Sequence, residues 1–232
     1  MRKDTKLAIG ISTTLILVGI FIFLWILPFL YVYIGILDFG STNVQNTKWD
    51  KMAVRYSIFP AQKIYTIESA LPGLIVNKEY DTAIEYVEEL EKLSSAEPNI
   101  KYLAAYAYIQ KEDYQKALKY AKESNNKGQL AQVYINLKDY KSAKKLVDEM
   151  FEQKQVSPRA YIYKAQIEII ENNWTGADKS INKLLIVAPN NREALKIKAK
   201  IAHHTGNNTE HKKCIKKLKL IELKNSTRIV GE

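Results

Sequence analysis

The chain has 232 residues, a formal net charge of +10 and one cysteine, Cys214, which excludes a framework of intrachain disulfides. Glycine is scarce, and no run of alternating apolar and polar residues stands between turn signals, which argues against β-strands. Because Lys, Glu, Ala, Leu and Ile dominate after residue 60, we expect an all-α fold.

The first feature along the chain is an apolar segment, residues 7–37, whose 31 residues include no charged side chain. About 20 apolar residues cross the hydrocarbon core of a bilayer, so the segment predicts a transmembrane helix that is tilted, kinked at Pro28 or extended beyond the bilayer. A cleaved signal peptide would have an apolar core of roughly 7–15 residues and a small-residue cleavage site. No such site follows Leu37, so we expect an uncleaved anchor preceded by a short N-terminus, residues 1–6.

The charges around this segment predict its orientation. Three bases, Arg2, Lys3 and Lys6, directly precede it, whereas the first bases after it are Lys48 and Lys51. The positive-inside rule therefore predicts a single-pass protein of the cell membrane, with a cytoplasmic N-terminus and an extracytoplasmic C-terminal domain. The alternative is a domain that faces the cytoplasm and tethers soluble partners to the membrane.

Residues 38–60 are expected to connect the anchor to the main domain. Residues 38–47 are polar and poor in helix formers, which predicts a short linker. A helical stripe of Trp49, Met52, Ala53 and Tyr56 then predicts a juxtamembrane helix. This helix either packs on the first repeat or lies on the membrane surface.

An aromatic-x-x-Ala tetrad recurs at residues 80–83, 114–117, 140–143 and 174–177, with steps of 34, 26 and 34 residues. Pro, Asn and Gly breakers divide residues 61–224 into five expected helical hairpins, at 61–95, 98–124, 127–154, 158–188 and 191–224. A hairpin of two short helices buries its apolar face by stacking on its neighbours. The alanine is expected where two helices come closest, and the aromatic, including Trp174, is expected to be buried against the next hairpin.

Residues 158–189 resemble a tetratricopeptide repeat (TPR). The family's aromatic, small, aromatic, small, apolar, apolar and proline positions are filled by Tyr161, Ala165, Trp174, Ala177, Ile181, Leu184 and Pro189. The second hairpin matches with Ala105, Tyr108, Tyr114, Ala117 and Ala121, and the third with Ala131, Tyr134, Tyr140, Ala143 and Val147. The resemblance covers about 160 residues and implies a right-handed superhelical stack of hairpins in residues 61–224.

The two ends of the array depart from the repeat pattern. In the first hairpin Leu71 replaces the small residue and Pro72 interrupts the first helix, and in the last hairpin Asn208 and His211 replace the tetrad. Atypical terminal units are expected of capping repeats. Residues 225–232 are expected to form a C-terminal tail.

The resemblance implies a concave groove, lined by the first helix of each pair, that binds an extended peptide or a partner helix. Aligning the motif places Tyr102, Tyr106, Ile109, Gln132, Asn136, Arg159, Ile162, Gln166, Lys196 and Lys200 in this groove. Aromatic, amide and basic side chains are typical of a protein-binding surface. The alternatives are that the chain's own termini fill the groove, or that the convex face binds partners.

The last expected helix carries a basic patch, Lys212, Lys213, Lys216 and Lys217, beside an apolar stripe of Cys214, Ile215, Leu218 and Ile221. Either this helix caps the array with a solvated outer face, or it docks acidic partners or anionic lipid. Nucleic acid is not expected, because aromatic residues do not alternate with these lysines.

No catalytic or metal-binding pattern is evident. The chain has no Gly-rich phosphate loop, nucleophile elbow or HExxH motif, and the spacing of His203, His204, His211 and Cys214 matches no standard zinc site. The acidic residues Glu85, Glu88, Glu89 and Glu91 are interpreted as a solvated helix face with Lys partners. We therefore expect no enzyme, no metal and no cofactor, and a buried Cys214 that behaves as a small apolar residue.

These features together predict a membrane-anchored scaffold or adaptor. The expected setting is a bacterial envelope complex with a role in secretion, a pilus-like machine, division or chaperoning at the translocon. A lipid-binding or acidic-partner-binding module that uses the basic C-terminal helix is the alternative from another class.

Overall fold

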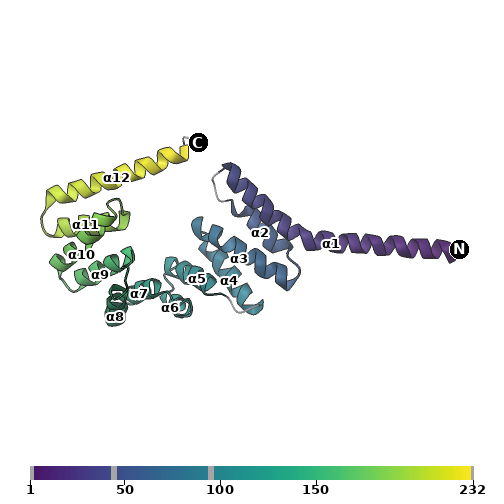
Figure 1. Ribbon diagram of the computed structural model, residues 1–232, viewed down its shortest axis with the longest axis horizontal. Helices are drawn as coiled ribbons and strands as arrows, with labels where there is room; N and C mark the ends of the chain where they lie inside the picture. The colour runs from purple at the N-terminus through teal and green to yellow at the C-terminus, as the bar shows by residue number, and fades with distance from the viewer. Residues whose placement is uncertain (1–2, 43–45, 94–96, 231–232) are drawn as a thin grey trace. The chain divides into compact units, whose positions relative to one another are not determined.

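The computed structural model describes residues 3–42, 46–93 and 97–230. In these ranges the chain forms twelve α-helices and no β-strand, which confirms the all-α prediction (Figure 1). The helices are α1 Lys3–Thr42, α2 Thr47–Tyr56, α3 Pro60–Val76, α4 Tyr80–Leu93, α5 Pro98–Gln110, α6 Tyr114–Glu123, α7 Lys127–Asn136, α8 Tyr140–Phe151, α9 Pro158–Ile170, α10 Trp174–Val187, α11 Arg192–His204 and α12 Asn208–Val230.

The chain divides into two compact units. Unit 1, Met1–Asn125, holds α1 to α6, and unit 2, Asn126–Glu232, holds α7 to α12. The division falls inside the repeat array, where Asn125 has a positive φ of 52° and the Asn126 side chain caps α7 by accepting from the Gln129 N–H. These two residues end one helix and start the next without a linker.

Helix α1 contains the apolar segment and is longer than expected. Its stretch Thr13–Asp38 is long and apolar enough to cross a membrane, by length and composition. The helix continues through residues 38–42, which the sequence indicated as linker. Its end is held by Asp38, whose carboxylate accepts from Asn46 Nδ2 at 3.1 Å and from Trp49 Nε1 at 3.3 Å.

Helix α2 packs against both α1 and α3, so it lies on the first hairpin, which was one of the two expected positions. Ala53 and Val54 are its buried apolar residues. A second link comes from Glu79, which accepts hydrogen bonds from Thr47 Oγ1 and Lys51 Nζ of α2. At the other end of the chain, α12 continues to Val230 through most of the expected tail, because no glycine or proline stops it before Gly231.

Five helical hairpins, α3–α4, α5–α6, α7–α8, α9–α10 and α11–α12, confirm the expected repeats. Each turn contains one residue of positive φ: Lys78, Glu112, Lys138, Asn172 or Gly206. In four of them the next residue, Asp113, Asp139, Asn173 or Asn207, accepts a hydrogen bond from the backbone N–H three residues later. The tetrads at 114–117, 140–143 and 174–177 are therefore preceded by a helix stop and an N-cap, which fixes where the second helix of each of these hairpins starts.

In the tetrads the alanine is buried as expected, whereas the aromatic residue at 174 is buried less than expected. The four alanines, Ala83, Ala117, Ala143 and Ala177, are completely or almost completely buried. Trp174, which was expected to be buried, is only partly so: its ring stacks on His204 with centroids 3.7 Å apart and contacts the core of unit 2 at its edge. The imidazole covers one face of the indole.

Candidate functional site

The predicted groove residues of unit 2 lie on the first helices α7, α9 and α11, and α9 contacts both α7 and α11. Arg159 of α9 and Lys196 and Lys200 of α11 are exposed. The amides Gln132 and Asn136 of α7 are half-buried and bonded to each other, with Gln132 Nε2 donating to Asn136 Oδ1 at 3.1 Å. We call these bases and amides, on the first helices of unit 2, the α7–α9–α11 face.

One predicted groove residue in unit 2 does not reach this surface. Ile162 is only 2 % exposed and belongs to the apolar core of the unit. Helix α9 packs against α7, α8, α10 and α11, so a wide arc of its surface is buried. Ile162 lies within that arc. It is therefore a core residue, and its predicted place in the groove was wrong.

Gln166, also on α9, has a half-buried side chain. Among the buried side-chain polar atoms of the residues that the structure describes, its Oε1 is the one without a hydrogen-bond partner. A buried acceptor that lacks a donor costs about 1–3 kcal/mol.

In unit 1 the predicted groove residues lie on α5, which packs beside α3. Tyr102, Tyr106 and Ile109 are all half-buried. The Tyr106 ring packs edge-on against Tyr80, with centroids 6.3 Å apart. Unit 1 therefore contributes an aromatic surface, in contrast to the basic surface of unit 2.

The predicted basic patch lies on α12. Lys212, Lys213 and Lys216 are exposed and Lys217 is half-buried. Lys213 Nζ is 3.5 Å from the Glu210 carboxylate. Beside the lysines, Ile215, Leu220 and Leu223 line a shallow hollow of about 870 Å³, so the surface is both apolar and basic.

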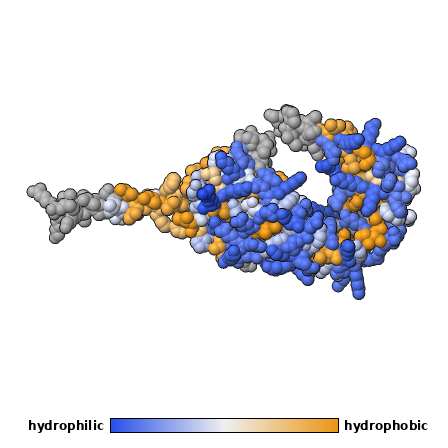
Figure 2. All heavy atoms as spheres, turned by 180° about the vertical axis from the view of Figure 1, so that it is seen from behind, coloured by the Kyte–Doolittle hydropathy of each residue, from blue (hydrophilic) through white to orange (hydrophobic). Residues whose placement is uncertain are grey.

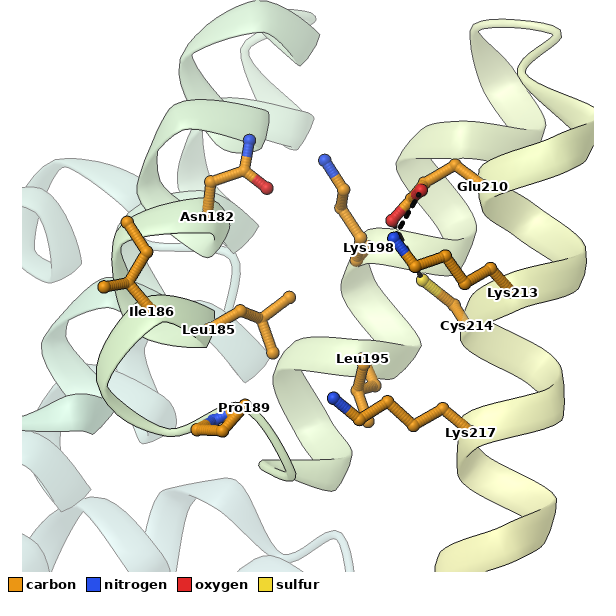
Figure 3. Close-up of a pocket in the computed structure, with 10 residues that line it drawn as sticks. All are labelled: Asn182, Leu185, Ile186, Pro189, Leu195, Lys198, Glu210, Lys213, Cys214 and Lys217. Carbon is orange, nitrogen blue, oxygen red and sulfur yellow. Dashed lines mark hydrogen bonds and ion pairs between the residues drawn. The ribbon is translucent and has the colours of Figure 1, made fainter.

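A pocket of about 360 Å³ lies between α10, α11 and α12 (Figure 3). Figure 3 shows Glu210 pointing toward Lys213 and Cys214, while Lys198 approaches from α11. Cys214 is buried, as expected, and burial together with the nearby Glu210 raises the pKa of its thiol. A thiol with a raised pKa is protonated at neutral pH and is a poor nucleophile.

The histidines near Cys214 have other neighbours. His204 stacks on Trp174, and His211 Nδ1 lies 3.0 Å from the carbonyl oxygen of Ala199. In the part of the chain that the structure describes, no three His, Cys, Asp or Glu side chains converge as a metal site requires.

Sequence reasoning missed two polar residues that connect α1 and α2 to the first hairpin. Glu79 stands where four other hairpins have their N-cap, but its carboxylate binds α2 instead. Gln62 is completely buried, and its Nε2 donates to the carbonyl oxygen of Trp25 in α1. The nearest signal in the sequence is a Glu at a position where the later hairpins have Asp or Asn.

The repeated hairpins, their left-handed turn residues and their buried alanines define a helical repeat protein of TPR fold. A solved structure of a tetratricopeptide repeat protein from Parabacteroides merdae ATCC 43184 has a TM-score of 0.64 and 18 % sequence identity, and the match covers 78 % of this chain and 75 % of that one. A second solved structure, of YrrB, a TPR protein with an unusual peptide-binding site, has a TM-score of 0.49 and 14 % identity over 79 % of this chain and 96 % of that one. No family model and no curated protein matches the sequence.

Proposed function

We propose that this protein is a membrane-anchored scaffold that binds protein partners and is not an enzyme. The proposal rests on the α7–α9–α11 face: α9 contacts both α7 and α11, and these helices carry the exposed bases Arg159, Lys196 and Lys200 and the amides of Gln132, Asn136 and Gln166. Basic side chains attract carboxylates, and amides bond to the backbone of an extended segment. The partner is therefore a peptide or helix that carries acidic side chains.

The anchor is α1, and its proposed orientation follows the charges. With Arg2, Lys3 and Lys6 on the cytoplasmic side, α2 to α12 lie outside the cytoplasm. This arrangement suits a bacterial envelope complex, in which the anchor confines a partner-binding domain to the membrane surface. Secretion, pilus-like, division and translocon-associated chaperone complexes are the settings that we propose.

Site-specific photocrosslinking tests the face. A photoreactive amino acid at Lys196 in the full-length protein, in native membranes, is expected to give a discrete crosslinked product. The matched control carries the same photoreactive amino acid at Lys179, an exposed position on α10, the second helix of its hairpin. It is expected to give no crosslinked product. Arg159→Glu together with Lys200→Glu is expected to reduce the Lys196 product at least several-fold, because the reversed charges repel an acidic partner. Equal products at Lys196 and Lys179 would contradict the groove. A third variant carries the photoreactive amino acid at Lys216, and a product from that variant alone would favour the basic patch of α12.

The orientation has a separate test. Lys141→Cys places a thiol on the exposed surface of α8, while the native Cys214 is buried and gives a low background. A membrane-impermeant maleimide added to intact cells is expected to label this variant as fully as it does after permeabilisation. Labelling only after permeabilisation would place the domain in the cytoplasm and support the tethering alternative.

A further inference from the structure

The apolar helix α1 does not stand apart from the helices that follow it. Its second half packs against α2 and α3 through aromatic pairs, with Phe59 against Phe21 and Trp25 at 5.5 and 5.1 Å between ring centroids. Further along, Phe29 contacts Tyr65 at 5.2 Å. Helix α3 therefore starts beside the middle of α1 and runs in the same direction.

This packing places the turn between α2 and α3 at a defined height along α1. Leu7 is the earliest residue at which the span can begin, since Lys6 before it is charged. At 1.5 Å per residue, Phe21 and Trp25 are then about 21 and 27 Å into a hydrocarbon core that is about 30 Å thick. A tilt of α1, or a later start of the span, would shorten these distances and place both residues farther from the opposite surface of the hydrocarbon core.

The surface at this height is apolar and aromatic. Ile58, in the turn, is 57 % exposed, and Phe59 beside it is half-buried. Tyr56 and Tyr65 on either side are exposed, and tyrosine concentrates where hydrocarbon meets headgroups. We call Tyr56, Ile58, Phe59, Pro60 and Tyr65 the α2–α3 corner. Figure 2 shows the hydrophobic surface of α1 continuing to where it meets the other helices of unit 1.

The nearby bases do not oppose contact with lipid. Lys63 Nζ donates to the carbonyl oxygen of Val54 at 3.1 Å and pairs with Glu89 at 3.1 Å, so its charge is compensated within the protein. Arg55 is exposed in the last turn of α2, with its guanidinium 6.0 Å from the centre of the Tyr56 ring. An arginine there reaches lipid phosphates while its stem lies along the apolar surface.

A second, independent observation comes from Pro28, the proline inside α1. Proline has no N–H, so the carbonyl of Leu24, four residues earlier, loses its helical donor, and the ring weakens the adjacent bond to Trp25. The buried Gln62 side chain supplies the missing donor, since its Nε2 donates to the Trp25 carbonyl and lies 3.4 Å from that of Leu24. In water such carbonyls would be hydrated, whereas in hydrocarbon only the protein can satisfy them.

We propose that the α2–α3 corner is inserted in the leaflet away from the N-terminus, where Ile58 and Phe59 contact lipid hydrocarbon. The protein then touches the bilayer at two places, the span of α1 and this corner. The inference rests on the proposed span, and it adds that the first hairpin begins inside the membrane rather than at the end of a linker above it.

Spin-label accessibility tests the corner. The full-length Cys214→Ser protein is reconstituted in phosphatidylcholine vesicles, with a nitroxide on Ile58→Cys or, as a second corner position, Tyr65→Cys. Phe23→Cys in the span is the lipid reference, and Ile186→Cys, 80 % exposed in unit 2, is the water reference. At position 58 the ratio of oxygen to nickel-chelate accessibility is expected to lie several-fold above that at position 186 and near that at position 23.

The outcomes separate this inference from the proposed span. A lipid-like value at position 23 with water-like values at positions 58 and 65 overturns the inserted corner and leaves the span intact. Water-like values at all the labelled positions overturn the span and the corner together. Helical content measured by circular dichroism shows that each labelled variant is folded.

Discussion

Replacing Leu184 by alanine is expected to destabilise unit 2 by about 3 kcal/mol, within the 2–5 kcal/mol typical of buried leucines. Leu184 is 0 % exposed and belongs to the core cluster that links α8, α9, α10 and α11. The substitution removes the apolar contacts and leaves a cavity that packed helices on several sides can fill only partly.

Ile186 provides the matched control on the same helix. It is 80 % exposed, so Ile186→Ala is expected to change the stability by less than about 0.5 kcal/mol. Thermal unfolding of the full-length protein in micelles, followed by tryptophan fluorescence, reports the difference because Trp174 contacts the same core. Equal effects of the two substitutions would show that α10 does not pack as described.

The second large effect is expected at Asp50 of α2. Burial raises the pKa of this carboxyl from 3.8 to about 6, and the side chain is 9 % exposed. A folded state that holds its proton more tightly than the unfolded state loses stability as pH rises from about 4 to about 6. Above that range the charged carboxylate is buried at an unfavourable cost of up to about 3 kcal/mol, at about 1.4 kcal/mol per pKa unit.

Asp50→Asn removes the ionisation with little change of shape. At pH 8 the variant is expected to unfold at a higher temperature than the native protein, and the gap is expected to close as the pH is lowered toward 4. Asp148→Asn, at an exposed position of α8, removes the same charge and is the control. A gap that is constant between pH 4 and 8 would show that Asp50 ionises normally in the folded protein.

The hairpins were predictable because the residues that start and end each helix lie close to it in the sequence. Pro98, Pro158 and Asn126 begin helices or precede them, and in the first four hairpins the tetrad stands at the start of the second helix. The burial of Cys214 followed from its place in an apolar stripe of α12. Ile162 was placed wrongly because a motif gives the position of a residue along its helix, whereas burial depends on how many neighbours surround that helix.

Contacts between distant segments were not predictable. The acidic face of α4 was interpreted as solvated, yet Glu88 and Glu91 accept hydrogen bonds from the hydroxyls of Tyr108 and Tyr120. Their lysine partners, Lys116 and Lys119, come from α6 rather than from the same helix. The packing of α1 on α2 and α3 depends in the same way on pairs such as Gln62 with Trp25, which are 37 residues apart.

The contact between Gln62 and the carbonyls that precede Pro28 has a consequence for how the protein is made. The donor for the α1 carbonyls is synthesised after the apolar segment and lies on a different helix. In the proposed topology, insertion of α1 is therefore complete only when the first hairpin has folded back onto it. We expect a nascent chain that stops before α3 to leave α1 unstable in the bilayer and open to quality-control proteolysis, so that the anchor depends on the domain as much as the domain depends on the anchor.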